Sequence, residues 1–545
     1  MRVKLTLTVL FVCMLAASVY AARPDLALHD PSPDQIYWFI QSGDCNIGRQ
    51  GNLPANHLDW LLVEARTVIN PAFIVLTGSL VDGTNAQENP QPPYVEEWQQ
   101  YSQIMFANGA NDDWLFDLPG SRDAWNDPGL NAYLTASVQG SATGEYRHAW
   151  SIDTPKGEYL FLGVSTVDDS GPAYPDEPAV FSEQDRQWLY GWSEEAEQAR
   201  MLFVFGHNPL QTFLPWEGVY KLYQWLYDYG AAGYGYSHFP LDTLDERSEF
   251  TGDLLRVNGG GLGFNSTCQY TLWVIDHDGV SVNCAKAEQF PIVISSPLDA
   301  GLGGSNGYAY PLAAGAPSVH VRALACAPGQ PASLNGVIED VGIAFDLLRV
   351  GDSPIYQGEF DATGLDNGTY RITVSAEGLQ SHTITVKMAE VQCYDGKDND
   401  GDGLIDFPQD SGCASYSDSL ETGDRSPIAD AGADVTAFVG ENVIFNGEES
   451  YDPDLAEHIF FEWTIDVENN KDRIVPEVVT SYAYSMPGTY HATLRVTDSR
   501  TNSDTDTMTV TVIEGEEEPD DIAEGPENVP EEEDEDADYG WGCGS

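Results

Sequence analysis

The sequence predicts an α/β domain followed by two all-β sandwiches, and three observations carry this prediction. From residue 23 to about 289, short apolar strands alternate with amphipathic helical stretches, a rhythm typical of helices packed on the faces of a sheet. After Phe290 the helical period disappears, and the strands alternate apolar and polar residues as in a β-sandwich. A polar Asp/Gly-rich stretch then separates this sandwich from a second one.

The 545 residues are enough for several domains at a typical size of about 150 residues each. Changes in composition and pattern mark the boundaries between them. The predicted segments are a signal peptide at 1–22, the α/β domain at 23–289, an Ig-like β-sandwich at 290–390, a Cys-bounded Asp/Gly-rich calcium loop at 391–424, a second sandwich at 425–514 and an acidic disordered tail at 515–545.

The N-terminus has the features of a secretory signal. Arg2 and Lys4 precede an apolar run over residues 5–19, and small residues follow at Ala21 and Ala22. The run is shorter than the roughly 20 residues that a membrane-spanning helix needs, and no later stretch reaches that length. We therefore expect a secreted or cell-surface protein without a transmembrane span.

The chain is extremely acidic, with 87 Asp and Glu against 24 Lys and Arg and a formal net charge of -63. This charge makes nucleic acid and anionic membranes poor partners. It suits either a salty medium, where screening weakens the self-repulsion, or a chain that collects Ca²⁺. From Glu514 onward the sequence has no Lys or Arg, which is typical of a solvated spacer. Cys543 near its end is a candidate attachment point.

The elements follow from the local patterns. In the α/β domain we expect helices over "NHLDWLLVEART" and "EEWQQYSQIMFA". In the first sandwich, "SVHVRALAC" and "GTYRITVSA" are predicted strands. The predicted strands of the α/β domain are Ile36–Ile40, Phe73–Leu76, Tyr159–Val164 and Met201–Phe205.

The cysteines predict two disulfides. Cys268 and Cys284 flank a strand–turn–strand pattern whose Asp-Gly turn would set them side by side, and Cys393 and Cys413 bracket the Asp/Gly-rich loop. The sequence leaves the pairing of the others open. These are Cys45, Cys326 and Cys543.

The stretch "DNDGDGLIDFPQD" has the first part of an EF-hand-type calcium loop. Carboxylates stand at positions 1, 3 and 5, and a glycine at position 6 permits the bend. Position 12 is Gln409 instead of Glu, so two later carboxylates would have to complete the shell. The predicted Ca²⁺ ligands are Asp398, Asp400, Asp402, Asp406 and Asp410, and the alternative is a solvated acidic turn. The wider stretch also resembles a calcium-loop module of secreted bacterial proteins.

Residues 427 to 514 resemble a polycystic-kidney-disease (PKD) domain. The matching stretches are "ADAGADVTAFVGENVIFNGEESYDPD", "FEWTID" around Trp463, and "YSMPGTYHATLRVTDS". The resemblance implies an immunoglobulin-like sandwich that spaces or adheres.

The α/β domain resembles the calcineurin-like metallophosphoesterases. Five stretches carry the match in the family's order: "SGDCNIGR", "VLTGSLVDG", "DLPGSRDAWND", "FVFGHNPL" and "GYGYSHFP". The resemblance implies a four-layer β-sandwich with flanking helices. With "FPIVISSP" after it, the domain is most similar to a transmembrane family that pairs it with an Ig-like domain. This chain departs from that family by lacking its C-terminal membrane helices.

In this family two metal ions activate a water, and a carboxylate between them offsets their repulsion. By resemblance that carboxylate belongs at Ser79, whose hydroxyl cannot replace it. By the same resemblance, Arg122 replaces the histidine that serves as general acid, and an arginine does not release its proton. The other replaced positions are Asn46, Ser121 and Tyr236. The retained positions are Asp44, His207 and His238, too few for a convincing transition-metal cage.

Several alternatives stay open at this stage. The two histidines are either hydrogen-bonded core residues or ligands of a single metal ion. Arg122 and Ser121 form either an anion pocket or, for Arg122, a surface ion pair with an acid such as Asp123.

The sequence thus predicts a modular surface or secreted protein with a degenerate, catalytically inactive phosphoesterase domain that binds or scaffolds. One alternative is a one-metal phosphoesterase that works through Asp44, His207 and His238. The other is a Ca²⁺-dependent adhesion protein. A cell surface or an extracellular polymer is a candidate partner, and the ligand is left open.

Overall fold

The computed structural model describes most of the chain between residues 32 and 514. The predicted signal peptide, the acidic tail, Asp400, Asp402 and Cys543 lie outside the described residues. Within the described ranges no helix combines the length and apolar character needed to cross a bilayer. The described residues are 32–49, 51–83, 92–167, 180–210, 219–238, 248–251, 254–304, 306–395, 397–399, 405–407, 410, 413, 420–421, 426–452, 459–467, 471–498 and 502–514.

The first sheet of the α/β domain has the strand order β11-β10-β1-β2-β3. β1, β2 and β3 run parallel to one another, whereas β10 is antiparallel to both β1 and β11. Parallel neighbours need long crossovers, and the first group of helices supplies them. The strands are β1 (Ile36–Ser42), β2 (Ile74–Leu76), β3 (Leu115–Asp117), β10 (Tyr270–Asp276) and β11 (Gly279–Ala285).

The second sheet has the order β4-β5-β6-β7-β9-β8. Its four central strands are parallel, and the two edge strands are antiparallel to their neighbours. The central strands are buried over nearly their whole length because both faces of the sheet are covered. The strands are β4 (His148–Thr154), β5 (Gly157–Gly163), β6 (Met201–Phe205), β7 (Gly233–Tyr236), β8 (Ser248–Thr251) and β9 (Leu254–Asn258).

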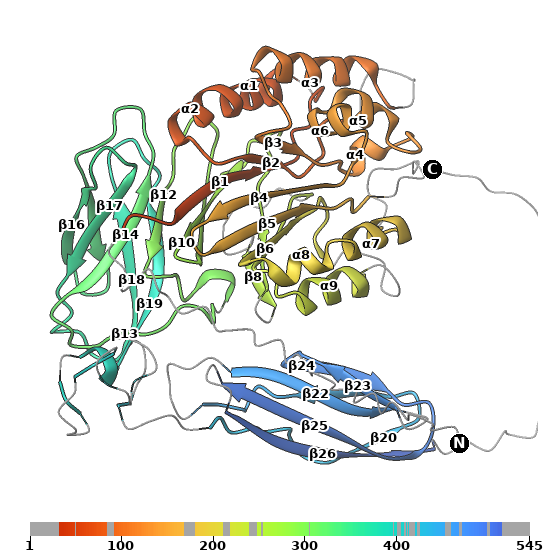
Figure 1. The fold of residues 1–545 in the computed structure, drawn as a ribbon, viewed down its shortest axis with the longest axis vertical. Coiled ribbons are helices and arrows are strands. Elements are labelled where there is room, and N and C mark those ends of the chain that lie inside the picture. Colours follow the sequence, from red (N-terminus) through yellow and green to blue (C-terminus); the bar gives the residue numbers. More distant parts are fainter. Residues whose placement is uncertain are drawn as a thin grey trace, which may run out of the picture.

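The two sheets lie between two groups of helices (Figure 1). The first predicted helix is a continuous run of α1, a π-helical turn at Leu61–Ala65 and α2, and the second is α3. In the second group, the Ser182 hydroxyl caps α7. The helices are α1 (Leu53–Trp60), α2 (Arg66–Ile69), α3 (Val95–Ala107), α4 (Ser121–Ala124), α5 (Asn131–Ala136) and α6 (Val138–Thr143) in the first group, and α7 (Glu183–Tyr190), α8 (Ser193–Gln198) and α9 (Val219–Asp228) in the second.

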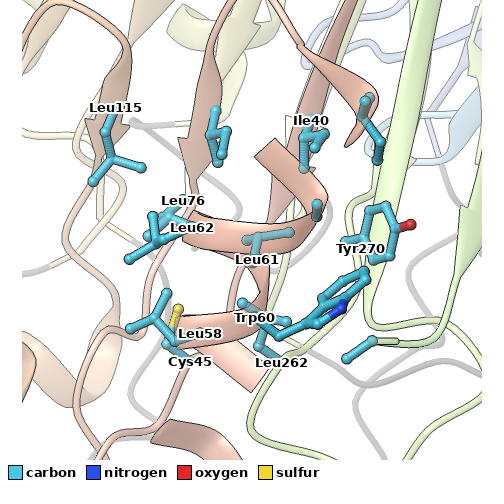
Figure 2. Packing of buried hydrophobic residues seen from close by; sticks show 14 of the residues in the cluster. Ile40, Cys45, Leu58, Trp60, Leu61, Leu62, Leu76, Leu115, Leu262 and Tyr270 are labelled. Carbon is cyan, nitrogen blue, oxygen red and sulfur yellow. The ribbon is translucent and has the colours of Figure 1, made fainter. Parts of the chain in front are cut away.

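Separate apolar cores fix these layers. Ile40, Leu76 and Leu115 of the first sheet pack against α1 and its continuation, together with Tyr270 of β10 (Figure 2). The opposite face of the sheet carries Phe39, which packs edge-to-face against Phe161 and Phe203 of the second sheet. The domain is therefore a mixed α/β fold in which buried aromatic rings hold one sheet against the other.

The next domain is built from one eight-stranded sheet, of order β12-β14-β17-β16-β15-β18-β19-β13, around its own core. Buried and exposed residues alternate along β19, as expected for a strand with one face on the core. The strands are β12 (Ile292–Ser296), β13 (Leu312–Ala313), β14 (Val319–Ala325), β15 (Ser333–Ile338), β16 (Ile343–Arg349), β17 (Ile355–Phe360), β18 (Gly368–Ser375) and β19 (His382–Ala389).

A buried ion pair joins this sandwich to the α/β domain. Arg322 of β14 donates from Nε to Oδ2 of Asp276, at the end of β10, over 2.9 Å, and both side chains are fully buried. The Ser295 hydroxyl donates to the same oxygen over 2.6 Å. A buried pair is tolerated when its polar atoms are satisfied in this way.

The last domain is a β-sandwich around Trp463 and Phe445. Five strands form one sheet, in the order β20-β26-β25-β22-β23, and β21 pairs with β24. The C-terminal part of the chain is thus all-β, as predicted. The strands are β20 (Val435–Phe438), β21 (Asn442–Asn446), β22 (Ile459–Val467), β23 (Lys471–Val475), β24 (Val479–Ala483), β25 (Gly488–Asp498) and β26 (Ser503–Ile513).

Both predicted cysteine pairs lie at disulfide distance. The Cα atoms of Cys268 and Cys284 are 5.4 Å apart, and those of Cys393 and Cys413 are 5.7 Å apart. Between β10 and β11, His277 and Asp278 adopt left-handed backbone angles, so they occupy the turn instead of the predicted Asp-Gly pair. Cys45 and Cys326 are buried thiols.

Candidate functional site

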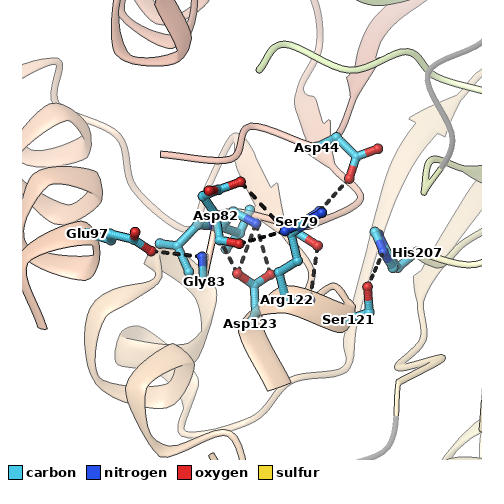
Figure 3. A network of polar contacts seen from close by, with 11 residues as sticks. Asp44, Ser79, Asp82, Gly83, Glu97, Ser121, Arg122, Asp123 and His207 are labelled. Atoms are coloured by element: carbon cyan, nitrogen blue, oxygen red, sulfur yellow. Dashed lines mark hydrogen bonds and ion pairs between the residues drawn. The ribbon is translucent and has the colours of Figure 1, made fainter. Parts of the chain in front are cut away.

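The five stretches that carry the phosphoesterase resemblance meet at one end of the two sheets. Each stretch lies at the carboxyl end of a parallel strand. These strands are β1, β2 and β3 of the first sheet and β6 and β7 of the second. Loops at this edge of parallel strands commonly form ligand sites. We call this group of loops the strand-end site, and Figure 3 shows its polar contacts.

Two glycines let the loops after β2 and β3 touch. Gly78 has a φ of 66°, and a Cβ on it would lie 2.4 Å from the backbone nitrogen of Gly120. A Cβ on Gly120 would in turn lie 2.6 Å from Cα of Ser79. Only glycine permits this approach of backbone to backbone, so both positions hold the loops in place.

Asp44 and Asn46 lie buried in the loop after β1. Burial raises the pKa of Asp44 to about 7, although the backbone of Ser79 and the charge of Arg122 oppose the shift. The Ser79 amide lies 3.4 Å from Oδ1 of Asp44, while Oδ2 has no hydrogen-bond partner among the described residues. Both polar atoms of the Asn46 amide also lack a partner there. Buried polar atoms of this kind indicate a bound water or ligand.

His207 and His238 are hydrogen-bonded to each other. Nε2 of His207 lies 3.0 Å from Nδ1 of His238 and 3.3 Å from the Ser121 hydroxyl (Figure 3 draws the second contact). The other ring nitrogen of His207 lies 2.9 Å from the carbonyl oxygen of Thr77, which can only accept. Burial, followed by the neighbouring His238, lowers the pKa of His207 well below its usual range, so its ring is neutral.

Arg122 pairs with an acid, as the ion-pair alternative predicted, but that acid is Asp82 and not the suggested Asp123. Nη1 of Arg122 donates to the Asp82 carbonyl oxygen over 3.0 Å and lies 3.7 Å from the Asp82 carboxylate. Asp123 is instead buried, where it accepts hydrogen bonds from the backbone amides of Leu80, Val81 and Gly120. Asp123 therefore braces the backbone of the loops and does not neutralise an arginine.

Two polar residues of the site were missed by sequence reasoning. Ser237, not Tyr236, reaches the site, where its hydroxyl lies 3.2 Å from Nδ1 of His207. Tyr236 stacks on Tyr234 in the core beneath the second sheet. Glu97 of α3 is buried and accepts the Gly83 amide over 2.9 Å. The amphipathic pattern of α3 does not show that one of its two glutamates is buried.

The donor set does not fit a two-metal centre. Ser79 stands where the bridging carboxylate belongs by resemblance, and its Oγ accepts the Arg122 amide over 3.2 Å. The imidazole nitrogens of His207 and His238 face each other. Among the described residues, Asp44 and these histidines do not form a group of three ligand atoms within 4.8 Å. A dinuclear centre needs several negative ligands around its two dications.

The Cys-bounded segment, residues 391–424, does contain such a group. Ligand atoms of Asp410, Cys413 and Glu421 lie within 4.8 Å of one another, and all three residues are buried. Because Cys413 is paired with Cys393, the group offers two carboxylates.

Glu421, which the sequence analysis did not include, accepts the backbone amides of Asn399 and Asp406 and so ties two parts of the loop together. Of the other predicted ligands, Asp398 is exposed, and Asp406 accepts the Asp395 amide over 3.0 Å.

The comparisons with known proteins identify the last domain and give distant relatives of the chain. Residues 424–512 match the family of the PKD domain, so the chain carries a PKD domain. Mouse transmembrane protein 62 is 26% identical over 363 residues, which are 65% of this chain and 54% of that protein. The Arabidopsis thaliana protein At3g03305, named as a metallophosphoesterase, is 22% identical over 190 residues, or 32% of this chain and 25% of that protein.

The chain thus spans about half the length of the mouse relative and a quarter of the plant relative. Both likenesses are weak homology. Among solved structures, GAP50, the anchor in the inner membrane complex of Plasmodium, is 15% identical. It matches 46% of this chain and 85% of that one, with a TM-score of 0.32.

Proposed function

We propose that this is a secreted or cell-surface modular protein whose α/β domain is a degenerate metallophosphoesterase that binds or scaffolds without hydrolysis. The observation that carries the proposal is the direct hydrogen bond between His207 and His238, over 3.0 Å. Nitrogen atoms that would each face a metal ion satisfy each other instead. The four-layer phosphoesterase sandwich is part of the proposal, and the helix–sheet–sheet–helix arrangement supports it.

The chemistry of the remaining groups also disfavours hydrolysis. A leaving alkoxide needs a proton from a group with a pKa near the working pH. Arg122 stands at that position and keeps its proton. His207 is buried and neutral, and its single ring proton is already donated to the Thr77 carbonyl oxygen.

The experiment is hydrolysis of bis-p-nitrophenyl phosphate by the full chain with excess Mn²⁺, compared with the Asp44→Asn variant. We expect no turnover above background in either protein. Turnover that the Asp44→Asn change abolishes would instead support the one-metal phosphoesterase.

An extracellular location is supported by the PKD domain and by the two cysteine pairs at disulfide distance, because such bonds persist in oxidising compartments. The name of the mouse relative describes a transmembrane protein, which is a counterpoint. Fractionation of the native host, with immunodetection of this chain, tests the location. Recovery in the cytosol would contradict it.

A second candidate role, Ca²⁺-dependent adhesion, rests on the Cys-bounded segment. Two buried carboxylates repel each other unless a cation or a proton lies between them, and Asp410 and Glu421 converge within 4.8 Å. We propose Ca²⁺ at this position because all the candidate ligands are oxygen atoms. Surface attachment that EDTA reverses and Ca²⁺ restores would favour adhesion, and attachment unaffected by EDTA would exclude it.

A further inference from the structure

We propose that the strand-end site binds a proton-bearing oxyanion, such as hydrogen phosphate, without a metal ion, through Ser79, Ser121 and Arg122. The proposal rests on the proposed non-catalytic role of this site and names its ligand class. Its basis is a surplus of hydrogen-bond donors, together with one buried acceptor.

The first surplus donor is the Ser121 hydroxyl. Since Nδ1 of His207 donates to the Thr77 carbonyl oxygen, its Nε2 carries a single lone pair. His238 lies 3.0 Å from that lone pair and Ser121 lies 3.3 Å from it. One lone pair accepts one good hydrogen bond, and the shorter contact belongs to His238. The hydroxyl proton of Ser121 is therefore available to a ligand.

The second donor is the Ser79 hydroxyl. Its oxygen accepts the backbone amide of Arg122 over 3.2 Å, but its proton has no acceptor among the described residues. The third donor is Arg122 itself. Only Nη1 of its guanidinium has a described partner, Asp82, and a quarter of the side chain (25%) is exposed. The rest of the planar fork suits the paired oxygens of an oxyanion.

Two arginines and several carboxylates share the strand-end site. The protein has only 24 Lys and Arg against 87 Asp and Glu. Even so, two arginines on different loops, Arg49 and Arg122, each act to lower the pKa of Asp44. The Arg49 guanidinium lies over the Phe264 ring, 4.2 Å from its centre, so the ring limits where it can point. The carboxylates of Asp44, Asp82 and Asp123 lie in the same loops, so the two arginines offset part of their charge, and an anion has to be held by the hydrogen-bond donors.

Asp44 sets the kind of anion. Its Oδ2 is buried without a hydrogen-bond partner in the described part of the chain, so it can accept a hydrogen bond. Figure 3 shows its carboxylate beside the loop that carries Ser79. A carboxylate repels a fully ionised oxyanion but accepts a hydrogen bond from one that keeps a proton. Hydrogen phosphate offers such a proton and sulfate does not, so the site is selective for phosphate over sulfate.

The test is calorimetric titration of the EDTA-treated full chain with inorganic phosphate and with sulfate at neutral pH. We expect phosphate to bind about tenfold more tightly than sulfate. Arg122→Gln should weaken phosphate about tenfold, and Ser121→Ala should weaken it several-fold. Asp44→Asn should strengthen sulfate and erase the preference. The matched control is Arg186→Gln, because Arg186 is similarly exposed (28%) but pairs with Glu183 on α7, and it should change nothing.

Three results would overturn the proposal: no phosphate binding at millimolar concentration, unchanged binding in both Arg122→Gln and Ser121→Ala, or sulfate binding as tight as phosphate in the unaltered chain. If Arg122→Gln does not fold by near-ultraviolet circular dichroism, Ser121→Ala carries the test. Methyl phosphate, compared under mildly acidic conditions where it keeps a proton, tells an esterified source from free phosphate, and binding of either supports the site. Phosphodiester turnover is measured separately, so a failed non-catalytic role and a failed anion site give different results.

Discussion

The strand-end site and the Cys-bounded segment both gather candidate metal ligands. They differ in how those ligands contact one another. In the first, His207 and His238 hydrogen bond to each other, and a serine stands at the bridging position. In the second, the carboxylates of Asp410 and Glu421 converge. The two proposals made for these regions therefore differ in one feature: carboxylates converge in the Cys-bounded segment, whereas two histidines and a serine stand in the strand-end site.

The largest expected change in metal affinity is in the Cys-bounded segment. Glu421→Gln removes one of two buried carboxylates, so Ca²⁺ affinity should fall about tenfold or more. Calorimetric titration of the EDTA-treated chain with Ca²⁺ measures it. Glu462→Gln, at an exposed position of β22, is the matched control and should leave the affinity unchanged. Equal affinity in the two variants would remove Glu421 from the shell.

Adding a carboxylate to the strand-end site should destabilise it. Ser79→Asp restores the bridging carboxylate beside buried Asp44 and Asp123, so in the absence of metal it should destabilise the fold by about 3 kcal/mol. Urea denaturation measures the loss, and Mn²⁺ should recover part of it. Ser79→Asn, similar in size but uncharged, is the control. If both variants lose the same stability, volume and not charge is responsible.

Glu97 sharpens the comparison, because this buried carboxylate should respond to protons and not to Ca²⁺. Burial raises its pKa to about 7, and the Gly83 amide opposes the shift. Because the folded protein holds this proton more tightly than the unfolded chain does, the contribution of Glu97 to the free energy of unfolding is fully present below about pH 4.5. It is lost as the pH rises through about 7.

Glu97→Gln should therefore stabilise the protein by about 2 kcal/mol more at pH 8 than at pH 5, measured by urea denaturation. The exposed neighbour Glu96→Gln is the control and should show no such difference. The same gain at both pH values would contradict the shift.

The smallest effect is expected at His238. Its replacement by Ala removes one hydrogen bond to His207, and Ser121 can take over the vacated lone pair, so the cost should be about 1 kcal/mol. Thermal denaturation measures it, with His491→Ala on an exposed face of β25 as the control. A loss of bound metal in the His238 variant would instead mark it as a ligand.

The sequence predicted the main architecture because periodicity records which faces are buried. Alternation over β18 and the unbroken apolar run of β6 both predict the observed strands. The two cysteine pairs followed from a hairpin and a bounded loop. Positions along a strand could be placed in this way because they depend on local pattern.

The side-chain partners in the loops could not be predicted in the same way. Arg122 pairs with Asp82, 40 residues away, because the loop after β2 folds back over α4. Glu421, which lies outside the calcium-loop pattern, comes within 4.8 Å of Asp410. Ser237 replaces Tyr236 in the site because the tyrosine ring packs in the apolar core. These contacts depend on tertiary packing, which a single sequence does not record.

The most direct test of the central claim is elemental analysis by mass spectrometry of the purified full chain and two variants, Asp44→Asn and Glu421→Gln. The proposed roles of the two regions predict calcium in the unaltered chain and in Asp44→Asn, less calcium in Glu421→Gln, and no stoichiometric transition metal in any of them. A stoichiometric transition metal that is lost in Asp44→Asn would contradict the claim, because it would show that the strand-end site binds a metal ion through Asp44.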